Sequence, residues 1–272
     1  PSNNEAWKER GKRFGFKIIE VPPLNPHPGF DYYIEAFKKA LTPRTRVLAF
    51  THLSNTVGDI FPAKELCSMA RKREIISLID GAQSFGLLDV DLSNIKPDFY
   101  SGSAHKWPCG PKETGVLFVN KSIQKRFWPS VYSVYKGSEG LAKTHEGLGQ
   151  RDTPAIYAFG KQIEFLRKIG QNNIEKRSGD LATEIIDGLQ NIQGISVYTS
   201  NKRLLRSAVV TFRPANLDPS KVVKALENDG IVAANLAGDG WAGVRFSPHF
   251  YNSDWDVKGA IDAIKGYVRK GL

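Results

Sequence analysis

Residues 75–84 read IISLIDGAQS, and this stretch decides the fold. The run 75–79 is almost wholly apolar and lacks polar alternation, which is typical of a strand buried on both faces of a parallel sheet. It ends in Asp80-Gly81, a pair that favours a turn. Similar runs occur at 16–21, 46–50, 98–101 and 115–119, and helical patterns occur at 31–41, 62–73 and 121–127. This alternation predicts an α/β fold with a mostly parallel sheet sandwiched by helices.

The pattern changes in the second half of the chain. A long amphipathic helix is predicted from Pro154 to residue 170, with Thr153 as its cap. The segments that follow predict strands near 195–198, 207–213, 231–236 and 243–247, and helices near 173–191, 219–229 and 254–269. We therefore expect two domains. Residues 1–170 form a large domain with a linker helix, and residues 171–272 form a smaller α+β domain.

Composition narrows the functional classes. The net charge is +10, but the basic residues are scattered and no nucleic-acid-binding motif is present, which favours a solvated surface over a nucleic-acid partner. No apolar run approaches the ~20 residues that cross a bilayer, so no membrane span is expected. The only cysteines, Cys67 and Cys109, form no CxxC pair. We therefore expect no cysteine-based metal site or disulfide framework, and a cytoplasmic location.

Polar residues gather where three predicted strands end. The segments THLSNTVG (51–58), DGAQS (80–84) and SGSAHKW (101–107) each follow an apolar run. Ligands bind beyond the carboxyl ends of parallel strands, so these segments should meet in one crevice. Taken alone, each has an ordinary explanation: an Asp-Gly pair is usually a turn, and a His-Lys pair usually lies on the surface. Their combination points to a site.

The combination matches the needs of pyridoxal phosphate. Lys106 can supply the amine for a Schiff base. Asp80 can place an anion beside the pyridine nitrogen, and the Gln83 amide can bond the ring oxygen. Ser103 and His105 lie within three residues of Lys106 and can reach the phosphate. We therefore expect pyridoxal 5′-phosphate as the cofactor and expect no metal.

At this point the sequence resembles the class V aminotransferase family, which has fold type I of the pyridoxal-phosphate enzymes. The segments DGAQ, SAHKW and THLSNTVG carry the resemblance, together with VRFSPHFYNSDW near the C-terminus. HKWPCGPKETGVLFV is similar to the isopenicillin N epimerase-like branch. The resemblance covers nearly the whole chain. It also implies that family members have a longer N-terminal part, so we expect the large domain here to be incomplete.

The resemblance assigns further roles. Lys106 would be the Schiff-base lysine, and Asn55 would lie beside the cofactor and the substrate carboxylate. Arg245 would bind that carboxylate, a task that suits a planar guanidinium. Gln150 stands where many relatives have a threonine that reaches the phosphate of the neighbouring subunit. A homodimer with sites at its interface is also implied.

The expected function is chemistry at the Cα of an amino-acid substrate, of the aminotransferase or epimerase type. Two alternatives remain open: a lyase that eliminates a β-substituent or breaks a C–S bond, and a truncated, non-catalytic family member. Cysteine desulfurases carry a reactive cysteine shortly before the motif arginine, whereas residues 235–243 contain none. This difference predicts that the chain is not a cysteine-persulfide desulfurase.

Overall fold

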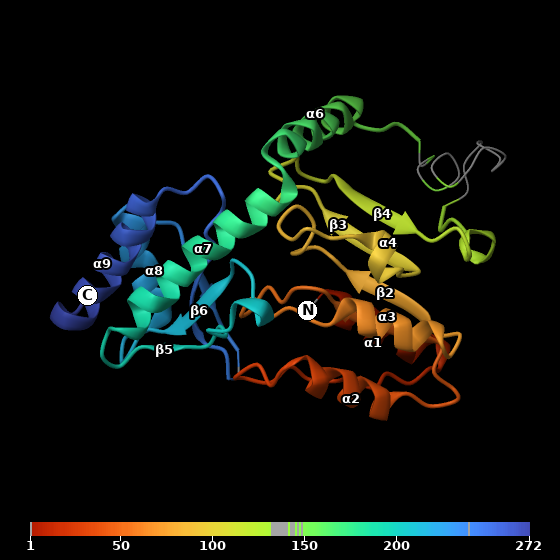
Figure 1. The fold of residues 1–272 in the computed structure, drawn as a ribbon, viewed down its shortest axis with the longest axis horizontal. Helices are drawn as coiled ribbons and strands as arrows, with labels where there is room; N and C mark the ends of the chain where they lie inside the picture. The colour runs from red at the N-terminus through yellow and green to blue at the C-terminus, as the bar shows by residue number, and fades with distance from the viewer. Residues whose placement is uncertain (1, 132–140, 142–144, 146, 148, 239) are drawn as a thin grey trace.

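The computed structural model describes residues 2–131, 141, 145, 147, 149–238 and 240–272. Its first sheet has the order β1-β2-β3-β4, and Figure 1 shows this sheet on the side that holds the N-terminal helices. The strands are β1 (Val47–Thr51), β2 (Ile76–Asp80), β3 (Phe99–Ser103) and β4 (Gly115–Val119). The first three are parallel, and β4 runs antiparallel to β3. The predicted α/β architecture with a mostly parallel sheet is confirmed.

The helices predicted at 31–41 and 62–73 are confirmed, whereas the helix predicted at 121–127 is only a 3₁₀ turn and the helices at 2–14 and 92–95 were not predicted. The helices of this half are α1 (Ser2–Phe14), α2 (Phe30–Ala40), α3 (Ala63–Arg71) and α4 (Leu92–Ile95), with a 3₁₀ turn, η1 (Gln124–Arg126). Leu66, Cys67 and Ala70 turn one face of α3 into the core, where they join Leu48, Ile79 and other strand residues. The burial of that stripe removes apolar surface from water and fixes α3 against β2.

Residues 16–21 do not form the predicted strand. They run outside any helix or strand after Gly15, and Phe16, Ile18 and Ile19 are exposed. A strand needs a neighbour to pair its backbone N–H and C=O groups, and no strand of the described residues pairs with this segment. Apolar patterning reports a tendency to be buried and does not specify the partner.

A second, antiparallel sheet lies in the C-terminal half, with the order β5-β6-β8-β7. Its strands are β5 (Ser196–Val197), β6 (Val210–Arg213), β7 (Ala234–Leu236) and β8 (Gly243–Phe246). The helices are α6 (Thr153–Ile169), α7 (Gln171–Gln190), α8 (Pro219–Asn228) and α9 (Asp254–Lys270), with a 3₁₀ turn, η2 (Arg203–Leu205). Buried residues of α7, α8 and α9 form one cluster with this sheet.

The junction between α6 and α7 is a single glycine. Gly170 has a φ of 90°, so the chain turns there between the two helices. We propose that the domains divide at residue 170, because the core clusters of the two sheets share no residue. The cap of α6 differs from the expectation. The Asp152 carboxylate, rather than Thr153, accepts from the Ala155 N–H, because the helix begins one residue earlier.

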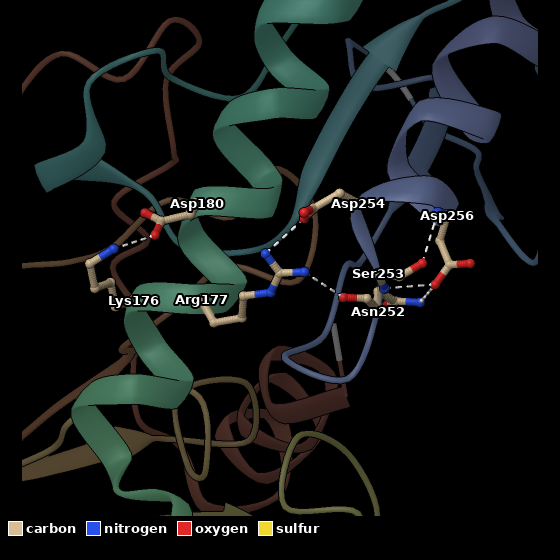
Figure 2. A network of polar contacts seen from close by, with 7 residues as sticks. All are labelled: Lys176, Arg177, Asp180, Asn252, Ser253, Asp254 and Asp256. Atoms are coloured by element: carbon tan, nitrogen blue, oxygen red, sulfur yellow. Dashed lines mark hydrogen bonds and ion pairs between the residues drawn. The ribbon is translucent and has the colours of Figure 1, made fainter.

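Polar contacts join α7 to the start of α9 (Figure 2). Arg177 forms an ion pair of 2.8 Å with Asp254 and donates to the Asn252 carbonyl at 2.9 Å. Ser253 and Asp256 close a capping box at the first turn of α9. These contacts hold the turn that precedes α9. Among the described residues, no helix is both long enough and apolar enough to cross a membrane.

Candidate functional site

The carboxyl ends of the parallel strands bring the predicted segments to one edge of the first sheet. Thr51 pairs with Asp80, and Asp80 pairs with Ser101 in the next strand. The Gly81 N–H continues this contact with a 2.8 Å hydrogen bond to the Ser101 carbonyl. A Cβ on Gly81 would lie 2.1 Å from the Tyr100 ring, so the turn after β2 can pack on β3 only because this residue is glycine.

Lys106 lies in a tight loop three residues after the end of β3. The Lys106 carbonyl accepts from the Cys109 N–H at 2.9 Å, and the Ala104 carbonyl accepts from the Gly110 N–H at 2.7 Å. His105 and Lys106 are exposed, whereas Trp107 is buried. Hydrogen bonds within the loop therefore fix its backbone, and the side chains of Lys106 and His105 are exposed to solvent.

Asp80 is the last residue of β2 and Gln83 lies in the turn that follows, and both are half-buried. The Asp80 carboxylate accepts from the Ala82 N–H at 3.0 Å, which ties it to its own turn. The Gln83 side-chain oxygen accepts from the Trp107 indole N–H at 2.8 Å. Trp107 thus connects the turn after β2 with the lysine loop. Trp107 follows Lys106 directly in the sequence, but no function was predicted for it.

Asn55 lies in the loop after β1, and residues of the C-terminal half form hydrogen bonds to that loop. Arg245 on β8 donates from Nη1 to the Asn55 carbonyl at 2.8 Å, across 190 residues of sequence. Thr211 on β6 donates to the Thr56 carbonyl. A Cβ on Gly58 would lie 2.4 Å from the Val209 carbonyl oxygen. The structure therefore brings together Asn55 and Arg245, and their shared role in one site stays a prediction.

Arg245 has unused hydrogen-bonding capacity. Its Nε is buried and has no hydrogen-bond partner among the described residues. Burial lowers the pKa of the guanidinium below its ordinary value, because the charged form loses solvation. A carboxylate bound to this side chain would satisfy Nε and restore favourable electrostatics, which fits the role that the resemblance implied.

Two buried titratable groups flank the Asn55 loop. His52 is 8% exposed, and burial lowers its pKa to about 4. Asp59 is 2% exposed, and burial raises its pKa to about 7. The Asp59 Oδ1 has no hydrogen-bond partner among the described residues. Both side chains are therefore held in an environment that favours the neutral form.

The remaining predicted residues are less tightly connected. Ser103 is half-buried at the end of β3, opposite Gly115 of β4. Gln150 is exposed and precedes the cap of α6 by two residues. Within the described part of the chain, no hydrogen bond joins Gln150 to the lysine loop. Its role toward a neighbouring subunit stays a prediction.

A contact between Trp107 and His249, which joins the two halves of the chain, was not predicted from the sequence. His249 follows β8, is 6% exposed, and stacks on the Trp107 ring with centroids 5.3 Å apart. Its Nε2 donates to the Trp107 carbonyl at 2.8 Å and lies 3.6 Å from the Cys109 sulfur. The 142 residues between Trp107 and His249 explain why no local pattern revealed the pair.

The residues present fit pyridoxal phosphate. The exposed Lys106 amine can form the covalent link, and Asp80 supplies a carboxylate at the adjacent strand end. Because the Gln83 oxygen is occupied by the indole, its amide N–H groups remain to donate. The orphaned Arg245 Nε adds a binding point for an anionic group. Each donor or charge therefore has a matching atom on the cofactor or on an attached amino acid.

Comparison with known proteins gives a consistent family. The family model described as "Aminotransferase class-V" matches residues 1–259. Isopenicillin N epimerase of Amycolatopsis lactamdurans is 30% identical over 277 residues, which cover 96% of this chain and 70% of that protein. A protein of Halalkalibacterium halodurans named "Probable cysteine desulfurase" is 31% identical, covering 94% of this chain and 66% of its own length.

Solved structures have the same fold. The apo structure of cysteine desulfurase from Thermococcus onnurineus NA1 superimposes with a TM-score of 0.86 at 23% identity, covering 100% of this chain and 70% of that one. A variant of C-DES with glycine linked covalently to its PLP cofactor superimposes with a TM-score of 0.85 at 17% identity, covering 97% of this chain and 71% of that one. At these identities the likeness concerns the fold.

The comparisons overturn one prediction. The chain was expected to be a transaminase or an epimerase and not a cysteine-persulfide desulfurase, because residues 235–243 lack a cysteine. That exclusion is wrong: a relative named as a cysteine desulfurase is as similar to the chain as the epimerase is. One loop of nine residues carries less weight than similarity over 94% of the chain.

Proposed function

The chain belongs to the class-V aminotransferase family, and we propose on this basis that it is a pyridoxal-phosphate enzyme acting at the Cα of an amino-acid substrate. Pyridoxal phosphate is the cofactor of this family, and Lys106 is the residue that would bind it covalently. One observation carries the proposal. Asp80, the last residue of β2, pairs with Ser101 of β3, and Lys106 lies three residues after β3 ends at Ser103.

The residues divide the work by their chemistry. When bound, pyridoxal phosphate supplies an electron sink that acidifies the Cα–H of an attached amine. The Asp80 carboxylate would hold a proton at the ring nitrogen, and the Gln83 amide would donate to the ring oxygen. Ser103 and His105 would donate to the phosphate. The Lys106 amine, once exchanged for the substrate amine, would take a proton from Cα and return one.

The substrate carboxylate would bind at the junction of the two halves. Arg245 already donates to the Asn55 carbonyl through Nη1, which leaves Nε and Nη2 to face a carboxylate. A guanidinium fixed by one bond presents its other donors in a defined plane. Asn55 is held in the same place by that contact, so its side chain would lie beside both the cofactor and the substrate.

The first reaction class that we propose is epimerisation or amino transfer, since both begin when Lys106 removes the Cα proton. The support is the epimerase relative, which covers 96% of this chain. A second candidate is cleavage of a C–S bond or loss of another β-substituent, and the desulfurase relative favours it. Both candidates require the same binding residues and differ in what happens after the proton leaves.

Incubation with single amino acids in D₂O separates the two candidates. Deuterium at Cα in a product of inverted configuration would support epimerisation. Formation of a 2-oxo acid, with conversion of pyridoxal phosphate to pyridoxamine phosphate, would support amino transfer. Release of sulfide or persulfide from cysteine or cystine would support the second candidate. No deuterium and no product from any amino acid, on a chain that holds the cofactor, would exclude both.

The cofactor itself is tested by absorbance. The purified chain with added pyridoxal phosphate is expected to show a near-visible band that borohydride removes, with the reduced adduct mapped to the peptide that contains Lys106. A chain that shows no band at saturating cofactor would contradict the proposal. Modification of a surface lysine such as Lys112 in place of Lys106 would move the covalent role elsewhere.

We further propose that the chain works as a homodimer. Exposed apolar side chains on α6, namely Ile156, Tyr157 and Phe165, and Trp128 ahead of that helix support this proposal. In the proposed dimer these exposed side chains would be covered by the partner subunit. Light scattering coupled to size-exclusion chromatography would show a mass of about twice 30.2 kDa. A monomer that retains full cofactor binding would contradict the proposal.

A further inference from the structure

We infer that Trp107 is a positioning residue that fixes the Gln83 amide so that its N–H groups face the ring oxygen of the cofactor. This inference rests on the proposed function, because it concerns the same site. It goes further in assigning a role to Trp107 and to His249, the C-terminal residue that stacks on it.

The orientation of the Gln83 amide follows from the chemistry of its partner. An indole N–H can donate and cannot accept. At 2.8 Å from the Trp107 Nε1, the Gln83 group must therefore be the carbonyl oxygen Oε1, since an N–H group there would face another donor. Rotation of the amide by 180° would lose this bond and leave the buried indole N–H without a partner, which costs free energy.

Trp107 is itself held from two sides. Its ring is 5% exposed and packs in a cluster with Leu53 and Leu87 of the first half and Val209 of the second. His249 stacks on the ring and donates to the Trp107 carbonyl at 2.8 Å. Because a carbonyl only accepts, His249 Nε2 must carry the proton. The indole therefore has a fixed position from which to direct Gln83.

The turn that carries His249 is fixed in the same way. The Asn252 side-chain oxygen accepts from the His249 N–H at 2.9 Å, and Arg177 of α7 donates to the Asn252 carbonyl. Figure 2 shows Arg177 and Asn252 side by side at the start of α9. A continuous set of contacts thus runs from α7 through His249 and Trp107 to Gln83. Supporting contacts of this kind keep a binding group in its productive geometry.

The first test uses the chain without cofactor, by ¹H–¹⁵N NMR of the tryptophan side chains. Trp107→Phe is expected to remove one indole N–H resonance and to identify it. Gln83→Leu is expected to shift that same resonance and to leave the other four in place, because only the Trp107 N–H loses its acceptor. An unmoved Trp107 resonance in the Gln83→Leu variant would overturn the inference.

The second test measures the pH dependence of the cofactor band. A donor at the ring oxygen stabilises its anionic form, so Gln83→Leu is expected to raise the apparent pKa of the band. Trp107→Phe keeps the ring stacking but frees the amide to rotate, and it should shift the pKa in the same direction by a smaller amount, on the order of half a unit. In the Gln83→Leu background, Trp107→Phe should have no further effect.

The outcomes separate the inference from the proposed function. If Trp107→Phe shifts the pKa equally with and without Gln83, Trp107 acts on packing alone and the inference is overturned. A normal band in the parent chain with no shift in Trp107→Phe overturns the inference and leaves the proposed function intact. A parent chain that forms no band overturns both, and the indole resonance then reports whether the hydrogen bond itself exists.

Discussion

Arg245 and Asn55 are joined by a 2.8 Å hydrogen bond from the guanidinium Nη1 to the backbone carbonyl, although 190 residues separate them. The contact joins β8 of the second sheet to the loop after β1 of the first. It also means that Arg245 has two possible functions, in holding the loop and in binding a substrate carboxylate, which experiment can separate.

We expect Arg245→Ala to raise the KM for amino-acid substrates by about tenfold to a hundredfold, because a hydrogen bond to a charged group is worth roughly 1.5–3 kcal/mol. Cofactor affinity should change far less. Steady-state kinetics and a cofactor titration measure the two effects. Arg213→Ala, on the exposed end of β6, is the matched control and should leave both unchanged. Equal losses in KM and cofactor affinity would show a structural role.

Lys106→Ala is expected to abolish the Schiff-base absorbance, the borohydride-reduced covalent adduct and any turnover, since no other residue of the loop offers an amine in its place until Lys112. Absorbance before and after borohydride measures the effect. The matched control is Lys112→Ala, an exposed lysine of the same loop, which should keep the band. A borohydride-reduced covalent adduct retained in Lys106→Ala would refute the covalent role of Lys106.

Gly58→Ala is expected to destabilise the chain by at least about 2 kcal/mol, for two reasons. Gly58 has a φ of 75°, and an added Cβ would lie 2.4 Å from the Val209 carbonyl oxygen. Urea unfolding measures the effect. Gly160→Ala on α6, where a Cβ meets no atom within 4 Å, should instead be neutral or stabilising. Equal stability of Gly58→Ala and the parent would contradict the close contact.

Asp59 makes stability depend on pH. Burial raises its folded-state pKa from 3.8 to about 7, so the folded state binds more protons than the unfolded state between these values. Its contribution to stability is therefore present below about pH 4 and is lost as the pH rises to 7. Asp59→Asn should remove this loss and raise the stability at pH 8 by on the order of 3 kcal/mol.

Urea unfolding of the Asp59→Asn variant and the parent from pH 4 to 8 checks this difference. Subtraction of the two curves is needed because His52 acts with the opposite sign: burial lowers its pKa to about 4, so its contribution is lost as the pH falls below 6.5. Asp262→Asn, an exposed position on α9, serves as the control. Parallel curves for Asp59→Asn and the parent would refute a buried, neutral Asp59.

Much of the first sheet could be predicted from the sequence because each of its strands is a short apolar run. The runs at 46–50, 75–79, 98–101 and 115–119 each became a strand within two residues of the prediction. The run at 16–21 did not, since pairing depends on neighbours that local patterning does not encode. The cap at Asp152 in place of Thr153 shows the same limit at the scale of one residue.

The site was predictable only in part. Asp80, Gln83 and Lys106 follow adjacent strands, so the rule for parallel sheets brings their segments to one edge. The Trp107–Gln83 and Trp107–His249 contacts depend on side-chain directions and on how the two halves meet, which no spacing reveals. The wrong exclusion of desulfurase chemistry had a different cause. It treated one absent side chain as decisive, although a relative named as a cysteine desulfurase is 31% identical to the chain.

The bonds that join the two halves also set how they can move. The Ile60 N–H donates to the Leu205 carbonyl, and the Ser207 N–H donates to the Gly58 carbonyl, both at 3.0 Å. These backbone hydrogen bonds join the loop after β1 to the second half in the way that neighbouring strands pair. If the two halves rotate apart, the axis of that rotation would have to lie along these hydrogen bonds. Residues close to that axis, Asn55 among them, would move little, whereas residues far from it would move further. The protein could thus admit and release a ligand without dismantling the place where it binds.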